Sequence, residues 1–168
     1  TTPADRLIFS RLAKIVAAVD AAYDNFEFGE ITRELYSFVW NEFCDWYIEF
    51  SKARLGADAD PADRAVCQRN LVFVLGQILR LLHPIMPFVT EEIYQELPCE
   101  KDAPYLIVAA WPDAEELARY LDADAERAIQ IVTEVVLGIR STRARYGISP
   151  KQALAAVGKA SGADAALL

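Results

Sequence analysis

The sequence predicts an all-α fold, a helical bundle of about five helices joined by short connections. Apolar residues recur with the 3.6-residue period of a helix along most of the chain. Proline, glycine and capping residues divide this pattern into segments of helical length. An α/β fold needs several strands, and residues 105–110 are the one strand candidate. We expect that stretch to be a short extended segment that covers the bundle.

The first half of the chain predicts two long helices joined by a turn at 25–29. The apolar residues from Ile8 to Tyr23 form one face of a helix over about 5–23. The second helix runs over about 30–55, is rich in aromatic residues and stops before a glycine. Aromatic side chains at helical spacing are more often core than base-stacking surfaces. Those that we expect in the core are Trp40, Phe43, Trp46 and Tyr47.

The second half predicts three more helices. Asp60 and Pro61 supply an N-cap and a first helical residue, so the next helix runs from there to residue 82 or 83. A short helix follows over 87–96, and a long one runs from about 122–124 to 146. Residues 98–112 are expected to be loop apart from the extended segment. We place one domain over 1–150 and a weakly specified tail over 151–168.

The composition is that of a globular, acidic chain. Of 168 residues 54% are hydrophobic, which excludes a disordered protein. The 17 Lys and Arg against 25 Asp and Glu give a net charge of −8, a total that argues against a nucleic-acid binder. Three scattered cysteines without a C-x-x-C pair argue against disulfides and zinc, and for a cytoplasmic, reducing compartment. No apolar run reaches the roughly 20 residues of a membrane span, so we expect no membrane contact.

No catalytic motif is present in the sequence. The chain lacks G-x-S-x-G, a phosphate-binding glycine loop and H-E-x-x-H, and we predict no catalytic residue and no metal or cofactor. The single histidine, His83, precedes Pro84 in the last turn of a predicted helix. There it favours the negative end of the helix dipole, which is a structural role.

The distribution of charge is more informative than its sum. Residues 138–168 hold Arg140, Arg143, Arg145 and two lysines against one acid, whereas 91–126 is strongly acidic. Near the start of the chain, Arg6, Arg11 and Lys14 are opposed only by Asp5. If the two basic segments lie on one side of the bundle, they form a phosphate-binding face in spite of the negative total.

Four strings resemble a known family. They are ADRLIFSRL at 4–12, FVWNEFCDWYIEFSK at 38–52, LHPIMPFVTEEIYQ at 82–95 and IRSTRARYGISP at 139–150. In this order and spacing they resemble the anticodon-binding helical domain of class I aminoacyl-tRNA synthetases. The third string is typical of the Val, Ile and Leu enzymes, and the second and fourth point to the valyl branch.

The resemblance implies a tRNA-binding domain, with valine tRNAs and the catalytic and editing domains of the parent chain as partners. The parent would be a ligase that uses ATP and Mg²⁺, and a monomer. The catalytic and editing domains are absent here, and the appearance of both ends favours a non-catalytic fragment. The tRNA-binding residues that the resemblance implies are Arg6, Leu7 and Arg11 for the anticodon groove, and Arg140, Arg143 and Arg145 for the tRNA backbone.

The chain departs from the family pattern at two aromatic positions. The family usually has Trp where this chain has Tyr94 and Leu7, so a stacking role at residue 7 is weakened. Two alternatives stay open. The bundle can serve as a scaffold that braces other domains, or it can belong to an isoleucyl or leucyl enzyme.

Overall fold

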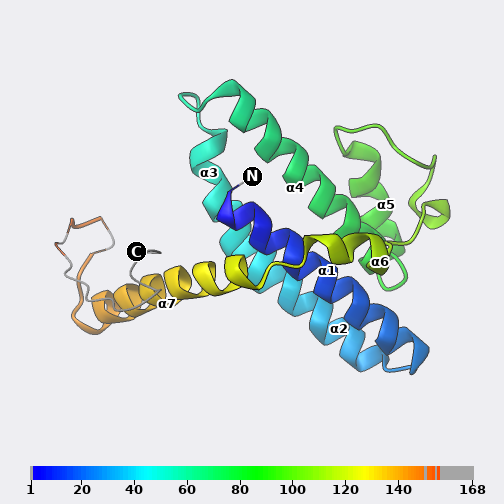
Figure 1. The fold of residues 1–168 in the computed structure, drawn as a ribbon, viewed down its shortest axis with the longest axis horizontal. Helices are drawn as coiled ribbons and strands as arrows, with labels where there is room; N and C mark the ends of the chain where they lie inside the picture. The colour runs from blue at the N-terminus through cyan, green and yellow to red at the C-terminus, as the bar shows by residue number, and fades with distance from the viewer. Residues whose placement is uncertain (1, 150, 154, 156–168) are drawn as a thin grey trace. The chain divides into compact units, whose positions relative to one another are not determined.

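The chain is predominantly helical over the residues that the structure, a computed structural model, describes, which are 2–149, 151–153 and 155 (Figure 1). No β-strand occurs among these residues, so the all-α class is confirmed. The chain divides into two compact units, Thr1–Leu121 and Asp122–Leu168. The predicted boundary at residue 150 falls within the second unit and stays a prediction. Most of the predicted tail lies outside the described residues.

Helix α1 (Pro3–Asp24) begins at a capping box. The Thr2 hydroxyl accepts the backbone N–H of Asp5, and the Asp5 carboxylate accepts the backbone N–H of Thr2. Apolar residues at helical spacing, from Ile8 to Val19, are buried in the core of the first unit. The first predicted helix is therefore confirmed, and the cap starts it two residues earlier than the periodicity indicates.

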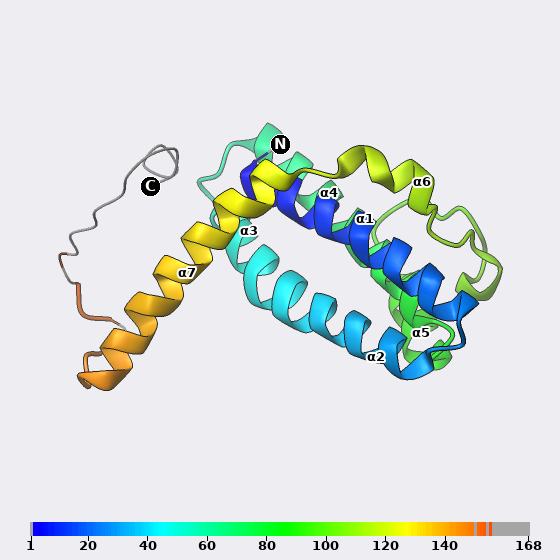
Figure 2. The ribbon, with the colours of Figure 1, turned by 60° about the horizontal axis from the view of Figure 1, so that its bottom comes forward.

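A second, continuous helical segment runs alongside α1 (Figure 2). It comprises α2 (Phe28–Tyr36), a π-helical stretch η1 (Ser37–Tyr47) and α3 (Ile48–Leu55). In a π-helix the hydrogen bonds join residues five apart, so the face that meets the core shifts. Phe38 and Phe43, five apart, are both buried, whereas Val39, which the regular period places in the core, is half-buried.

The aromatic side chains of this segment divide between core and surface. Phe43 and Tyr47 are buried as predicted. The prediction was wrong for Trp40, which is 55% exposed and stacks on Tyr36. Trp40 lies two positions from the buried Phe38, and residues two apart on a helix face different ways.

Helices α4 (Pro61–Leu82) and α5 (Pro87–Glu96) agree with the predicted bounds. The Asp60 carboxylate accepts the backbone N–H of Asp63 and caps α4. His83 follows the last residue of α4, and its Nδ1 lies 2.8 Å from the Thr90 hydroxyl of α5. The histidine therefore joins two helices, in line with the structural role predicted for it.

One stretch of α4 is long and apolar enough, by length and composition alone, to cross a membrane. Its Val74, Ile78 and Leu81 are buried in the same core as α1. A core helix of a globular domain passes the same test, so the stretch is accounted for by packing.

The segment between α5 and the second unit differs from the prediction. Leu106–Val108 forms a 3₁₀ turn, η2, so the expected extended conformation is wrong there and holds only at the flanking Tyr105 and Ala109. The turn is held because Leu106 donates its backbone N–H to Glu91 at 2.8 Å. A short helix, α6 (Ala114–Leu117), and a 3₁₀ turn, η3 (Ala118–Tyr120), follow. The predicted elements do not include them.

The second unit contains α7 (Ala123–Arg145). The Asp122 carboxylate caps its start by accepting the backbone N–H of Ala125. Gly147, with φ of 63°, ends it in the left-handed conformation that glycine adopts readily. The predicted last helix and its stop are therefore confirmed.

Candidate nucleic-acid interface

The first predicted site lies on the first turns of α1. Arg6 is exposed and Leu7 is half-buried. Leu7 and Arg11 are four residues apart and share a face of the helix, whereas Arg6 points away from that face. An apolar and a cationic side chain on one face are suited to an unpaired base and its phosphate.

Arg11 has a strong internal partner. Its guanidinium forms two hydrogen bonds of 2.7 Å with the Glu42 carboxylate and so joins α1 to η1. The recess beside it, about 130 Å³ in volume, is also lined by Glu34 and Glu42. Carboxylates in that position oppose phosphate binding. The structure therefore gives Arg11 a bracing role, and its predicted contact with tRNA stays a prediction.

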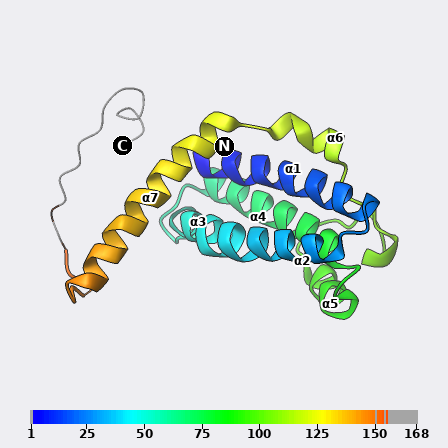
Figure 3. The same cartoon turned by 90° about the horizontal axis from the view of Figure 1, so that it is seen from below.

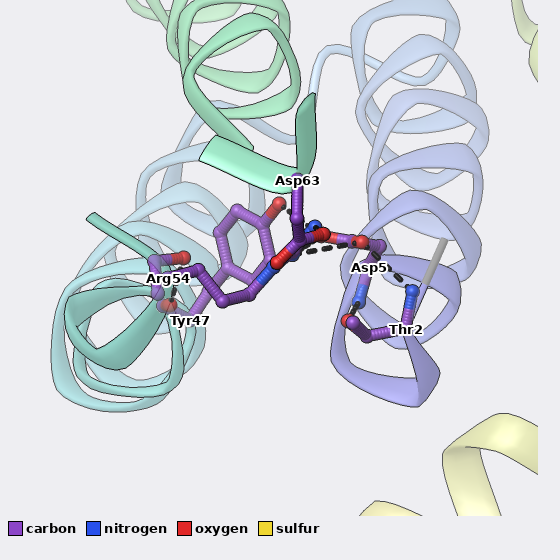
Figure 4. Close-up of polar contacts among 6 residues, drawn as sticks. Thr2, Asp5, Tyr47, Arg54 and Asp63 are labelled. Atoms are coloured by element: carbon purple, nitrogen blue, oxygen red, sulfur yellow. Dashed lines mark hydrogen bonds and ion pairs between the residues drawn. The ribbon is translucent and has the colours of Figure 1, made fainter. Parts of the chain in front are cut away.

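A buried polar cluster is centred on Asp5, the residue that precedes Arg6 in the sequence (Figure 4). The Asp5 side chain is fully buried. It accepts hydrogen bonds from the Thr2 backbone at 2.9 Å, from the Tyr47 hydroxyl at 2.8 Å and from Arg54 at 2.9 Å. Arg54 also forms a bidentate pair with Asp63, at 2.6 and 2.8 Å. The cluster joins the starts of α1 and α4 to η1 and α3.

The cluster is built to hold a charged carboxylate. Burial alone would raise the pKa of Asp5, but the hydrogen bonds from Thr2, Tyr47, Arg54 and Asn70 outweigh it and hold that pKa below its usual value. Burial, with the hydrogen bond to Asp5, raises the pKa of Tyr47, so the phenol stays a donor. A buried charge that is fully hydrogen-bonded fixes geometry. The start of α1, with Arg6 and Leu7, is therefore firmly placed.

The second predicted site is the end of α7. Ile148 donates its backbone N–H to Arg143 at 2.9 Å, and Gly147 donates to Ala144 at 3.3 Å, which is the Schellman pattern of a helix end. The Arg143 side chain continues this capping. Its guanidinium donates to the carbonyl oxygens of Ser149 and Gln152, each at 2.9 Å.

The three arginines of α7 divide into a pair and a single residue. Arg140 and Arg143, one turn apart, share a face of the helix. Arg145 lies on another side, with its guanidinium 6.0 Å from the centre of the Tyr146 ring. Residues 138–149 contain these three arginines and no acid. Cations also favour the negative end of a helix dipole, so this composition serves the helix as well as any anion that binds there.

Sequence reasoning missed the Asp5 cluster. Asp5 lies in the string at 4–12 and Tyr47 in the string at 38–52, so two of the four family-like strings meet in it. Asp5 is 42 residues from Tyr47 and 49 from Arg54, and no local pattern links residues so far apart. A carboxylate inside an otherwise apolar helical face was the available signal.

Comparison with known proteins gives one consistent family. Residues 5–157 match the family described as the anticodon-binding domain of tRNA ligase. The valine–tRNA ligase of Enterococcus faecalis is 47% identical over 143 residues, covering 85% of this chain and 16% of the relative. That of Staphylococcus carnosus is 40% identical over 151 residues, covering 90% and 17%. That of Corynebacterium glutamicum is 42% identical over 153 residues, with the same coverage. The chain thus spans about a sixth of these relatives.

Proposed function

Because the chain belongs to the anticodon-binding domain family of tRNA ligases, we propose that it binds the anticodon arm of valine tRNAs as part of a valine–tRNA ligase. The observation that carries this proposal is the identity of 40–47% to valine–tRNA ligases over most of the chain. The relatives compared above are all valine enzymes, which favours this reading over an isoleucyl or leucyl enzyme.

The start of α1 is our candidate for reading unpaired anticodon bases. Proteins recognise loop bases by stacking and by hydrogen bonds to base edges, and a guanidinium serves both. Arg6 is exposed beside Asp5, whose buried hydrogen bonds support the geometry that such contacts need. Leu7 offers apolar contact instead of the stacking ring usual in the family. Arg11 is the weakest member because Glu42 neutralises it.

The end of α7 is our candidate for contact with the tRNA backbone. Phosphate binding is favoured where several cations lie close together along the chain. The run from 138 to 149 has three arginines and no acid, which supports this role for Arg140, Arg143 and Arg145. We propose that both basic segments contact the same tRNA.

The ligation of valine, with its ATP and Mg²⁺, is assigned to the rest of the longer chain. Among the residues that the structure describes, no group of three or more His, Cys, Asp or Glu is arranged to hold a metal ion. From the similarity to about a sixth of the length of valine–tRNA ligases, we propose a non-catalytic role for this domain, within a monomeric, cytoplasmic enzyme whose catalytic and editing domains are its partners in the chain.

The experiment that tests the function is a binding competition at low salt. Labelled valine tRNA is bound to the chain and displaced either by the same tRNA or by a variant that differs only in its anticodon. Anticodon recognition predicts that the variant competes at least about tenfold less well, since each lost base contact weakens binding by about 1–3 kcal/mol. Equal competition would contradict anticodon reading and leave only backbone binding.

A second role, bracing other domains, is favoured by one observation. The first unit exposes many large apolar side chains, among them Phe26 and Phe88, and apolar surface of this kind favours contact with protein.

A further inference from the structure

Helix α5, the α1–α2 turn and the loop before α6 gather at one end of the first unit (Figure 3), and we consider six of the large apolar side chains exposed on these segments and at the start of α2. We call them the apolar belt. Their exposed fractions range from 39% at Trp111 to 90% at Phe88. The members are Phe26, Phe28, Phe88, Tyr105, Ile107 and Trp111.

The belt is continuous along the surface. One recess is lined by Phe88, Tyr105 and Ile107, and a neighbouring recess by Ile107 and Trp111. From Trp111 the contacts pass through Tyr23, whose ring centre lies 5.8 Å away, to Phe28 at 6.3 Å. Phe26 and Phe28 are 6.4 Å apart. Single exposed apolar residues are ordinary, but a contiguous patch of this kind is typical of an interaction site.

Phe26 has an unfavourable backbone conformation for so large a residue. Its φ is 58°, in the left-handed region that favours glycine and asparagine, and its side chain is 78% exposed. A bulky residue in that conformation, with its ring in water, contributes little to the stability of the domain itself. Strain of this kind is found where the surrounding structure or a partner uses the side chain.

The charges beside the belt exclude two kinds of occupant. Glu91 and Glu92 line the recess at Phe88, and Asp20 accepts the indole N–H of Trp111 at 2.7 Å. Arg80 lines the recess at Trp111, but it is paired with Asp102 at 2.6 Å. Carboxylates repel RNA phosphates, so the belt is unsuited to tRNA. A symmetric contact with a second copy would bring these carboxylates toward their own equivalents, which opposes self-association in a chain of net charge −8.

We propose that the apolar belt docks against another part of the same synthetase chain, on an apolar face bordered by Lys or Arg. The relatives are about six times longer than the stretch they share with this chain, so a large covalently attached surface is available to cover the belt. Attachment also gives that surface a high effective concentration. The proposal rests on membership of the family and is independent of whether Arg6 or the α7 arginines contact tRNA.

The test measures thiol accessibility at the belt. A reporter, Ile107→Cys, is placed in a Cys99→Ser background, both in the full-length synthetase that carries this domain and in the 168-residue chain. Because Cys44 is half-buried and remains, alkylation is followed by mass spectrometry in the peptide that carries the reporter. Ile107 is 75% exposed and Cys99 is also exposed, so neither change disturbs the core. We expect alkylation about tenfold or more slower in the full-length enzyme, because the reporter reacts only when the docked face opens.

A matched reporter on α3, Lys52→Cys, serves as the control and should react at similar rates in both proteins. Equal rates for the Ile107 reporter in the two proteins would overturn the proposal. So would protection that rises with concentration in the 168-residue chain, since that indicates self-association, or protection that requires added tRNA.

As a second readout, Phe88→Ser should lower the melting temperature of the full-length enzyme and leave that of the 168-residue chain unchanged. A similar drop in both would also contradict docking. Neither measurement depends on tRNA binding.

Discussion

Arginines of the first unit and arginines at the end of α7 are used differently. In the first unit, Arg11, Arg54 and Arg80 bind carboxylates of other segments at 2.6–2.9 Å, so these ion pairs join parts of the fold. At the end of α7, Arg143 binds carbonyl oxygens instead, and no acid occurs over 138–149. The net charge of −8 for the whole chain therefore does not describe how arginines act in either region. The use of an arginine follows from the residues around it and not from the sum of the charges.

The largest expected effect on stability comes from removing a carboxylate that pairs with an arginine in the first unit. Asp5→Ala leaves Arg54 with one carboxylate and the buried Tyr47 hydroxyl without its acceptor. Removing one member of a buried pair costs about 3–5 kcal/mol of unfolding free energy. Urea denaturation measures the loss. Asp63→Ala is the matched control and should cost less, because Asp63 is 43% exposed and Arg54 keeps Asp5. A larger cost for Asp63 would contradict the central place of Asp5.

The same cluster predicts a pH dependence with a definite sign. The folded pKa of Asp5 lies below its usual value of 3.8, so the unfolded chain binds the proton more readily. The stability from Asp5 is therefore fully present above 3.8 and is lost as the pH falls through the folded pKa. Unfolding measured between pH 5 and pH 2 should show this decline, and Asp5→Asn should flatten part of it. The remainder reflects Asp63 and Asp102, whose pKa values are also lowered. The hydrogen bond from Arg54 lowers the pKa of Asp63. Burial would raise the pKa of Asp102, but the nearby charge of Arg80 and the hydrogen bonds to its carboxylate lower it.

We assign Arg143 two roles, capping the end of α7 and contacting the tRNA backbone, and a substitution can separate them. Arg143→Ala removes two hydrogen bonds to the loop at 149–152, each worth about 1 kcal/mol or less at a partly exposed site. The last turn of α7 should then exchange its amide hydrogens several-fold faster. Arg140→Ala is the control and should leave that exchange unchanged while weakening tRNA binding. Unchanged exchange in Arg143→Ala would show that the capping contributes nothing.

The smallest effect concerns Arg11. Its pair with Glu42 is 39% exposed on the arginine side, so Arg11→Ala should lower the unfolding free energy by less than about 1 kcal/mol. We expect tRNA affinity to fall less than for Arg6→Ala, since Glu42 already neutralises Arg11. A greater loss of affinity for Arg11→Ala would mean that tRNA displaces Glu42, and the bracing role would then be secondary.

Local signals predicted most of the helices. Asp60 with Pro61 marked the start of α4, and Gly147 marked the end of α7, because caps and stops act within a few residues. The same kind of signal was overlooked at Asp113, which caps α6 by accepting the N–H groups of Glu115 and Glu116. The π-helical stretch was not predictable from a regular 3.6-residue period, and it explains why Phe38 replaces Val39 in the core.

The candidate site was predictable in part. Counting charges along the chain located the basic end of α7, since no folding is needed to see that a segment lacks acids. It did not reveal that Glu42 engages Arg11 or that Tyr47 and Arg54 hold the buried Asp5, because those partners are more than 30 residues away. The expectation that Arg6, Arg11 and the α7 arginines face one side stays a prediction.

The central claim is that the arginines of the acid-free stretch at the end of α7 bind tRNA phosphates, while arginines paired with glutamates on the surface of the first unit do not. The direct test is the salt dependence of valine-tRNA binding for Arg140→Ala/Arg145→Ala against Arg33→Ala/Arg119→Ala. The control pair removes the same charge from side chains that are 68% and 58% exposed but paired with glutamates. We predict that the slope of log K against log salt falls by about 2 in the first double variant and stays unchanged in the second. Equal reductions in both would contradict the account.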